Sequence, residues 1–453
     1  MNTFDTRHPA AGRFPRAFRS RVGSVLAAGA ACILAASPAQ ASDGSDGGRS
    51  TTAVVLLAMA AGAVYLAFKV VLDRARQKLL WVPGVEHLAL GLLLGPMVFG
   101  LGVFREPAPM APFAALAAGW VALSCGTDFN LRALSDPPRG GPRLGVLSAV
   151  LCGTAVTIAA RIVFTSGWFG RVDSDDAWLV AGWMGCAASA ASNTPLEAVQ
   201  KRFETADALP LLLRRSVRFA NLLAIIAFGV LTCIFRPGYG WEDRPLSPVE
   251  LAVVAVGLGS VLGVVLSPYF GRVDSLAGRV LVLAAMVAFA TGAASWLGLS
   301  TLWVSLAMGA VLVNISLVND RLVEAVRVAD APAVLVLLVL AGALWSPPPF
   351  VPALTITAGF VILRFFGRML ASWLVAKWLA PMRVDTGRGL LGQGAVAVAL
   401  AIAFRITSEG PLVDLGYTAI LASVLLHDLV APWALRGLLL DAGELRRPAE
   451  AKV

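Results

Sequence analysis

Apolar stretches of about twenty residues, the length that a helix needs to cross a bilayer, recur along most of this chain. They constrain its fold more than any other feature. The sequence of 453 residues is 58% hydrophobic and 14% charged, whereas soluble domains are about 25% charged. In lipid the backbone must satisfy its own hydrogen bonds, which a helix does within one segment. The sequence therefore predicts an all-α polytopic membrane protein.

The hydropathy pattern predicts about 13 transmembrane helices between residues 51 and 435. Their expected bounds are 51–72, 79–101, 110–129, 144–165, 176–198, 214–235, 248–268, 279–297, 300–318, 331–346, 350–372, 387–404 and 413–435. No connection between them is long enough to form a soluble domain. The membrane domain is expected to cover residues 51–437, followed by a short charged tail, 438–453.

The N-terminal residues have the pattern of a secretory signal. Residues 1–21 carry five arginines, a short apolar run follows from Val22 to Ala36, and Ala39-Gln40-Ala41 has the small residues of a cleavage site. We expect residues 1–41 to be a signal peptide and residues 42–50 a flexible leader. The alternative is a retained first membrane helix, although the apolar run is short for a full span.

Lysines and arginines between the spans are distributed unequally between the two sides. If residue 51 starts outside, the inner connections carry 22 of them, against six outside: Arg49, Arg105, Arg171, Arg236, Arg244 and Arg405. Positive loops stay in the cytoplasm. The sequence predicts an outer mature N-terminus and a cytoplasmic C-terminus, in agreement with a cleaved signal.

The sequence offers little for covalent chemistry. It contains no nucleotide-binding loop, no metal-type grouping of histidines and cysteines, and no nucleophile beside a base. The net charge of +9 comes from positive residues in short loops, so it does not indicate nucleic-acid binding. We expect no enzyme activity, no cofactor and no bound metal, with the lipid bilayer as the surrounding partner.

One stretch places polar residues where the surrounding sequence is apolar. It contains Ser192-Asn193-Thr194-Pro195 and, in the next span, Asn221. Broken backbone within a membrane survives only where protein or a water-lined cavity satisfies it, which predicts a binding site. The alternative is a proline kink satisfied by hydroxyl groups, with Asn221 joining two helices. Gly392 and Gly394 interrupt the twelfth span, and paired interruptions indicate an inverted-repeat transporter.

Several motifs, taken in order, resemble the cation:proton antiporter superfamily, in particular its bacterial sodium/proton-exchanger-like branch, the monovalent cation:proton antiporter-2 type. They are Gly91-Leu92-Leu93-Leu94-Gly95-Pro96, Gly126-Thr127-Asp128-Phe129-Asn130-Leu131, Gly298-Leu299-Ser300, Val304-Ser305-Leu306-Ala307-Met308-Gly309 and Leu363-Arg364-Phe365-Phe366-Gly367-Arg368. Each motif is loose by itself, but their order and span numbers fit the family across residues 51–437.

The resemblance implies an inverted-repeat fold in which discontinuous spans five and twelve cross, beside a separate dimerisation panel. It implies a homodimer in the bacterial inner membrane that exchanges a monovalent cation for protons. The ion site would lie between the span-five break and span six, with Ser192, Asn193, Thr194 and Asn221 as binding residues. The helix breaks would be at Pro195, Gly392 and Gly394.

The chain departs from the family at two acidic positions. Asn221 replaces the usual span-six aspartate, and Asn193 replaces the aspartate of a frequent span-five pattern. An amide can coordinate a cation but cannot titrate, so proton coupling through residue 221 is in doubt. Glu197 could supply a carboxylate, unless Lys201 or Arg202 neutralises it as an ordinary helix-end acid.

Arg364 matches a basic residue that contacts the span-six acid in the family. With Asn221 opposite, it could leave a positive site that repels a cation or favours an anion. It could instead extend toward the inner interface beside Arg368. Three functions stay open: a cation:proton antiporter with atypical coupling, a uniporter or channel-like relative for another ion, and a non-transporting regulatory membrane protein.

Overall fold

A computed structural model describes residues 84–94, 110–130, 140–167, 172–206, 208–235, 246–315 and 319–446. All of them belong to one compact unit, Arg76–Val453. The expected signal peptide 1–41, the leader 42–50 and the first predicted span 51–72 lie outside the described residues.

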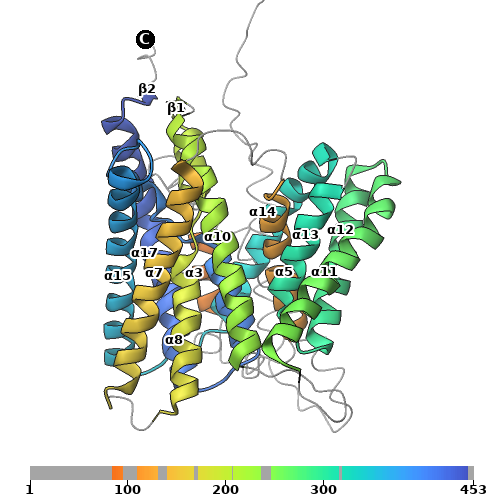
Figure 1. The fold of residues 1–453 in the computed structure, drawn as a ribbon, viewed down its shortest axis with the longest axis horizontal. Coiled ribbons are helices and arrows are strands. Elements are labelled where there is room, and N and C mark those ends of the chain that lie inside the picture. The colour runs from red at the N-terminus through yellow and green to blue at the C-terminus, as the bar shows by residue number, and fades with distance from the viewer. Residues whose placement is uncertain are drawn as a thin grey trace, which may run out of the picture. The chain divides into compact units, whose positions relative to one another are not determined.

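Helices make up nearly all of the described chain (Figure 1). They are α3 (Val85–Leu94), α5 (Ala111–Thr127), α7 (Gly140–Thr165), α8 (Ser174–Ser189), α9 (Thr194–Gln200), α10 (Ala208–Phe235), α11 (Pro248–Gly271), α12 (Leu276–Trp296), α13 (Thr301–Ile315), α14 (Asn319–Ala343), α15 (Phe350–Trp378), the 3-10 helix η2 (Thr386–Leu390), α16 (Gly394–Arg405) and α17 (Pro411–Asp441). Two short strands, β1 (Glu204–Thr205) and β2 (Leu445–Arg446), pair antiparallel.

The helices pack as two groups. Helices α7 to α10 and α15 to α17, with η2, contact one another and form what we call the crossing bundle. Helices α3, α5 and α11 to α14 form the second group, which we call the panel. The groups meet where α10 and α16 contact α5 and α13, where α10 contacts α11, where α16 contacts α14 and where α17 contacts α3. In Figure 1 most of the crossing bundle stands at the left and most of the panel at the right.

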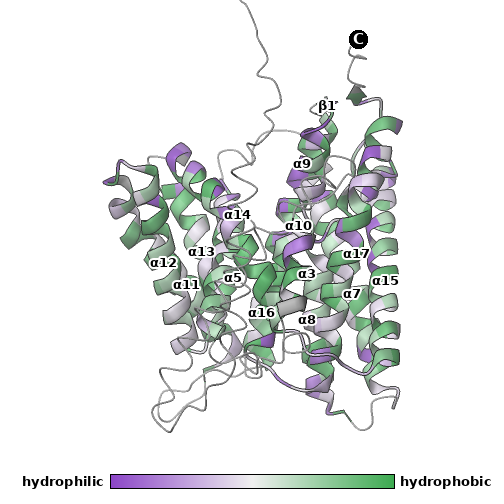
Figure 2. Cartoon of the chain, turned by 180° about the vertical axis from the view of Figure 1, so that it is seen from behind, coloured by the Kyte–Doolittle hydropathy of each residue, from purple (hydrophilic) through white to green (hydrophobic). Residues whose placement is uncertain are grey.

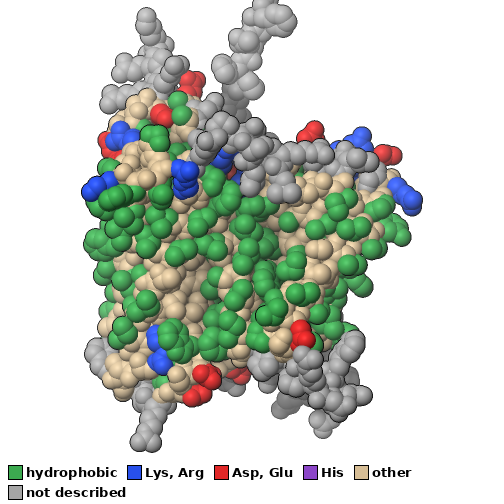
Figure 3. Space-filling model, viewed as in Figure 1, with side chains coloured by type: hydrophobic (Ala, Val, Ile, Leu, Met, Phe, Trp, Pro, Cys, Tyr) green, Lys and Arg blue, Asp and Glu red, His purple; other side chains and the backbone are tan. Residues whose placement is uncertain are grey.

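The outer surface is that of a membrane protein. Within the described residues, seven helices are long and apolar enough to cross a bilayer. Hydropathy colouring shows apolar residues along the helices (Figure 2), and hydrophobic side chains cover the middle of the face in Figure 3, with charged side chains near both ends. Large aromatic side chains are exposed at helix ends, as membrane interfaces favour: Phe350 and Trp378 at the two ends of α15, and Trp296 at the end of α12. The chain is a multi-pass membrane protein.

Two predicted spans are discontinuous, as the predicted fold class requires. The fifth, 176–198, consists of α8 and α9 separated by residues 190–193. The twelfth, 387–404, consists of η2 and α16 separated by residues 391–393. The prediction of crossed discontinuous helices is confirmed.

Several helix ends differ from the predicted bounds. Helix α14 begins at Asn319, well before the expected residue 331, and α17 continues to Asp441, past the expected domain end at residue 437. Hydropathy marks only the apolar part of a span, whereas a helix continues through charged residues that lie beyond it. Arg321, Glu324 and Arg327 are in helical conformation for this reason.

Glycines of two family-like motifs allow helix backbones to approach closely. A Cβ on Gly91 of α3 would lie 2.2 Å from the carbonyl oxygen of Val339 on α14. A Cβ on Gly126 of α5 would lie 2.3 Å from the carbonyl oxygen of Leu306 on α13. Small residues at helix crossings are a common packing device in membranes. These contacts hold the panel together.

The start of the predicted tail is attached to the crossing bundle. Strand β2 pairs with β1 in the α9–α10 connection, and the Glu444 carboxylate accepts the backbone N–H of Leu209 at 3.0 Å. At the same end Arg388 pairs with Asp441 at 2.8 Å. The hydrogen bond from Arg383 holds the pKa of Asp385 below its ordinary value. These contacts tie α9, η2 and the end of α17 together.

Candidate functional site

The two interrupted spans meet at their breaks. The backbone N–H of Ser192 donates to the carbonyl oxygen of Gly392 at 3.1 Å, which joins link 190–193 to link 391–393. Trp183 of α8 fixes the neighbouring helices, because its indole donates to the carbonyl of Leu400 on α16 and its ring stacks on Phe404. The crossing therefore has broken backbone from two spans within one buried region.

Local sequence explains each break. Pro195 lies in the first turn of α9, where its missing N–H leaves no hydrogen bond unmade. Ser192 accepts the backbone N–H of Thr194 at 3.1 Å and donates to its hydroxyl at 2.9 Å. Gly394 begins α16 with φ +67°, and a Cβ there would lie 2.5 Å from the Ser192 hydroxyl oxygen. Gly392 also packs tightly: a Cβ added there would lie 2.7 Å from the Pro195 ring.

Two fully buried arginines on α15 bind the carbonyls that the breaks leave free. Arg364 donates to Ala188 and Ala190 at the end of α8, and to Leu391 and Gly392 in the other link. Arg368 donates to Ala188, Ser189 and Ala190, and to the Ser148 hydroxyl. Helix C-termini carry partial negative charge and unpaired carbonyls. Each guanidinium thus compensates a broken helix end.

The positive charge of Arg364 is bound by backbone carbonyls. Its guanidinium donates to carbonyl oxygens and makes no hydrogen bond with Asn221. It is also 0% exposed, which excludes the alternative of a side chain extended toward the membrane interface. Breaking a helix creates strong acceptors, and a buried guanidinium with five donors fits several of them at once.

Asn221 of α10 contacts the same link from the other side. Its carbonyl Oδ1 accepts the backbone N–H of Ala191 at 2.9 Å, and its side chain is 8% exposed. Asn193 lies two residues further along the link, and its buried Oδ1 has no hydrogen-bonding partner among the described residues. The structure thus brings Ser192, Asn193, Thr194 and Asn221 together around the crossing.

Glu197 lies apart from that group. It is exposed on α9, two residues after Pro195, and its carboxylate makes no ion pair with Lys201 or Arg202 within the described part of the chain. No hydrogen bond joins its carboxylate to Ser192, Asn193, Thr194 or Asn221 in the described part of the chain.

A second buried polar group at the crossing is absent from the predicted site. Asp428 of α17, which is 5% exposed, accepts the backbone N–H of Gln393 at 2.9 Å. The Gln393 side chain donates to the carbonyl of Ala187 and accepts from Ser423, which in turn contacts His427. Ionisable residues inside a predicted span are a signal of function, and this criterion applied to His427 and Asp428 would have found them.

The two helix groups touch closely on the side of Asn221 toward the start of α10. Arg218 of α10 pairs with Asp128, which follows α5, at 3.2 Å, and Phe219 meets Phe129 edge to face. Asn314 of α13 donates to the carbonyl of Phe129 at 2.8 Å. This turn, residues 128–130, therefore joins the panel to the crossing bundle.

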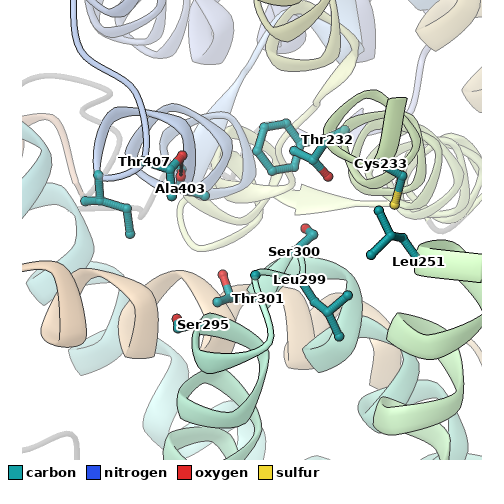
Figure 4. Close-up of a pocket in the computed structure, with 12 residues that line it drawn as sticks. Thr232, Cys233, Leu251, Ser295, Leu299, Ser300, Thr301, Ala403 and Thr407 are labelled. Atoms are coloured by element: carbon teal, nitrogen blue, oxygen red, sulfur yellow. Dashed lines mark hydrogen bonds between the residues drawn. The ribbon is translucent and has the colours of Figure 1, made fainter. Parts of the chain in front are cut away.

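On the other side of Asn221, toward the end of α10, the two groups enclose a cavity of about 190 Å³. Thr232 comes from α10, Ser300 and Thr301 from the α12–α13 connection and the start of α13, and Ala403 from α16 (Figure 4). Phe228, which also lines it, lies seven residues after Asn221 and hence on the same helix face. The cavity carries hydroxyl groups but no charged side chain among its lining residues.

Comparison with known proteins identifies the fold. No protein-family model matches the sequence, and no curated protein is similar to it. Two solved structures of the sodium/proton antiporter MjNhaP1 from Methanocaldococcus jannaschii are similar. One, at pH 8, has a TM-score of 0.59 and 18% identity, and the match covers 86% of this chain and 98% of that chain. The other has a TM-score of 0.58 and 18% identity, over 88% and 99%. The resemblance to cation:proton antiporters is thus confirmed for the fold, and this chain is a multi-pass membrane protein with a sodium/proton antiporter-like fold.

Proposed function

We propose that this protein is a secondary transporter of the cation:proton antiporter type, which moves a monovalent cation across the membrane in exchange for protons. One observation carries the proposal: two interrupted membrane spans cross at their breaks, with polar side chains gathered around them. Such crossings place ligand groups at membrane depth between inverted repeats. The antiporter-like fold supports the same function, and a transporter of this kind is not an enzyme.

The cation site in this proposal consists of neutral oxygens. Asn193 contributes the buried Oδ1 that has no partner, and the carbonyl of Asn221 lies across the same link. Ser192 and Thr194 contribute hydroxyl oxygens and hold the link in place. Because amides and hydroxyls do not titrate near neutral pH, the proton must bind to another residue. The coupling is therefore atypical for the fold.

The contacts between the two groups differ on the two sides of Asn221. The Asp128–Arg218 pair joins the groups on one side, and the cavity lies between them on the other. Exchange across the membrane requires that such contacts and openings alternate between the two sides. In our proposal the cavity is the access path on its side, and the turn at residues 128–130 closes the path from the opposite side.

We also propose the cellular setting from the sequence. The arginine-rich end faces the cytoplasm of a bacterium, the protein lies in the inner membrane, and two copies form a homodimer. The distribution of lysines and arginines supports the orientation. Resemblance to the antiporter family supports the homodimer and the membrane.

Purified protein reconstituted into vesicles with a pH-sensitive dye inside tests the function. Outward gradients of sodium, potassium or lithium are imposed in turn, with empty vesicles as the control. We expect at least one cation gradient to drive proton movement in the opposite direction. Cation or anion movement without proton movement would instead indicate the uniporter or channel-like alternative. No ion movement would favour a regulatory protein.

A further inference from the structure

Buried carboxylates are rare in the described residues, and one of them lies at the helix crossing. Among the described residues, only Glu86 and Asp428 are acidic with less than a tenth of their surface exposed, both at 5%. Glu86 belongs to the start of α3, where it accepts the backbone N–H of Gly84 and lies 3.9 Å from His87. Asp428 alone reaches the crossing.

Asp428 holds the beginning of α16. Its Oδ1 accepts the backbone N–H of Gln393 at 2.9 Å, the residue directly before α16 begins at Gly394. A helix N-terminus presents unpaired N–H groups and partial positive charge. A negative carboxylate is therefore stabilised at this position, and its charge helps to hold link 391–393 in place.

Arg364 holds the same link from the opposite direction. It donates to the carbonyls of Leu391 and Gly392, while Asp428 accepts from the N–H of the next residue, Gln393. The link thus lies between a fixed positive charge and a carboxylate. Loss of the negative charge would leave the guanidinium without its counter-charge and weaken the hold on α16.

The side chain of Gln393 extends this coupling to both interrupted spans. Its amide donates to the carbonyl of Ala187 in α8, and its oxygen accepts from Ser423 of α17. Because the single Ser423 hydroxyl proton is used there, the Nδ1 of His427 must donate to Ser423. Asp428 therefore belongs to a buried network that reaches the end of α8.

Among the described residues, the other ionisable groups on the helices around α17 do not supply a carboxylate to the crossing. Helices α3, α8, α9, α15, α16 and η2 pack against α17. From α15, Arg364 acts on Asp428, and Arg364 and Arg368 act on the neighbouring His427. The remaining acids and cations on these elements have other surroundings. Glu86 lies beside His87, Arg388 pairs with Asp441, Arg405 pairs with Asp414, and Arg436 lies over the ring of Phe203. Four more are exposed: Asp175, Asp176, Glu197 and Lys377.

We propose that Asp428 binds and releases a proton at the helix crossing, and so takes the role that an acid at position 221 or 193 cannot take in this chain. The proton binds to a carboxylate oxygen, neutralises it and weakens its hold on the start of α16. The use of that proton in transport rests on the proposed function, whereas the protonation itself does not.

Infrared spectroscopy of the full protein tests the protonation. Spectra are recorded at steps between about pH 4 and pH 9, a range that allows for the shifts of buried carboxyls. We expect a protonated-carboxyl band that disappears as the pH rises. The band should be absent in Asp428→Asn and retained in Glu86→Gln, the matched buried carboxyl away from the crossing. Asparagine keeps an oxygen that accepts the Gln393 N–H, so the variant preserves the structural contact.

Isotope labelling tests the assignment of the band to an aspartate without any substitution. Carbon-13 in the side-chain carboxyl of aspartate should shift the band, whereas the same label in glutamate should leave it in place. A band that Asp428→Asn leaves unchanged, or that only labelled glutamate shifts, would overturn the proposal.

Transport separates this proposal from the proposed function. In the vesicle assay, Asp428→Asn should lose most of the cation-driven proton movement, while Glu86→Gln should keep it. If the wild type and Asp428→Asn exchange ions with the same pH profile, Asp428 is not the proton-binding residue and the proposed function stands. If the wild type moves no ion, the proposed function fails, and the infrared titration still decides the protonation of Asp428.

Discussion

Arg364 shows how a charge is accommodated at membrane depth without a direct ion pair among the described residues. Its donors bind four carbonyl oxygens from two interrupted spans. Hydrogen bonds from a charged donor are stronger than neutral ones, and a buried charge is tolerated only when it is fully bonded. The residue is therefore part of the structure of the crossing as well as of its electrostatics.

We expect Arg364→Lys to destabilise the protein strongly. An ammonium group has three donors at one point and cannot span four carbonyls, so buried acceptors lose their partners. Loss of part of a buried charge network costs about 3–5 kcal/mol. Thermal unfolding in detergent measures the effect, with Arg383→Lys, an exposed arginine paired to Asp385, as the control. Equal melting temperatures for the two variants would contradict the role of Arg364.

Gly394 is the second residue on which the crossing depends. Its φ of +67° disfavours any side chain, and a Cβ added there would lie 2.5 Å from the Ser192 hydroxyl oxygen. Left-handed backbone alone costs a residue other than glycine about 1–2 kcal/mol. We expect Gly394→Ala to lower thermal stability, whereas Gly292→Ala, a membrane glycine with nothing within 4 Å, should not. A melting temperature as high in Gly394→Ala as in Gly292→Ala would show that the link tolerates a side chain.

At the scale of elements, the turn after α5 connects the panel to α10. The Asp128–Arg218 pair has both side chains about 40% exposed, so its contribution to stability is small, about 0.2–1 kcal/mol. Its position matters more, because Arg218 lies one helical turn before Asn221. Relative movement of the two groups would separate this pair.

We expect Arg218→Asp to slow exchange, because two like charges would then face each other at the turn. Asp128→Arg combined with Arg218→Asp reverses the pair and should recover much of the rate. Initial rates of cation-driven pH change in vesicles measure both, as in a double-mutant cycle. A double variant as slow as Arg218→Asp alone would mean that the pair itself is not the relevant contact.

Much of the element arrangement could be predicted from the sequence, but the partners of its charges could not. Pro195, Gly392 and Gly394 have backbone requirements that are visible in their residue types, and they mark the two breaks. The acceptors of Arg364 are backbone carbonyls. Because every residue carries one, no residue type in the sequence could identify which carbonyls Arg364 binds. Asp428 could be noted from the sequence as an ionisable residue in an apolar span, but its hydrogen bond with Gln393 was needed to place it at the crossing.

At the scale of the whole molecule, orientation follows from the charges between spans. Reporter fusions after Asp243 should be external, and fusions after Asp136 or Glu444 should be cytoplasmic, because positive connections remain inside. Paired fusions with an enzyme active only outside and a fluorescent protein active only inside read the two sides independently. Opposite signals at these positions would reverse the orientation, and the cavity would then face the cytoplasm.

The central claim is that this protein exchanges cations for protons without a titratable residue at position 221. Asn221→Asp introduces an acid that can accept the Ala191 N–H, one residue from a carbonyl bound by Arg364. A nearby positive charge favours the ionised carboxylate. The variant should therefore acquire, or markedly shift, the pH dependence of cation-driven proton movement in vesicles, whereas Asn221→Ala should not. Strong wild-type exchange whose pH profile is unchanged by Asn221→Asp would contradict the assignment of the site.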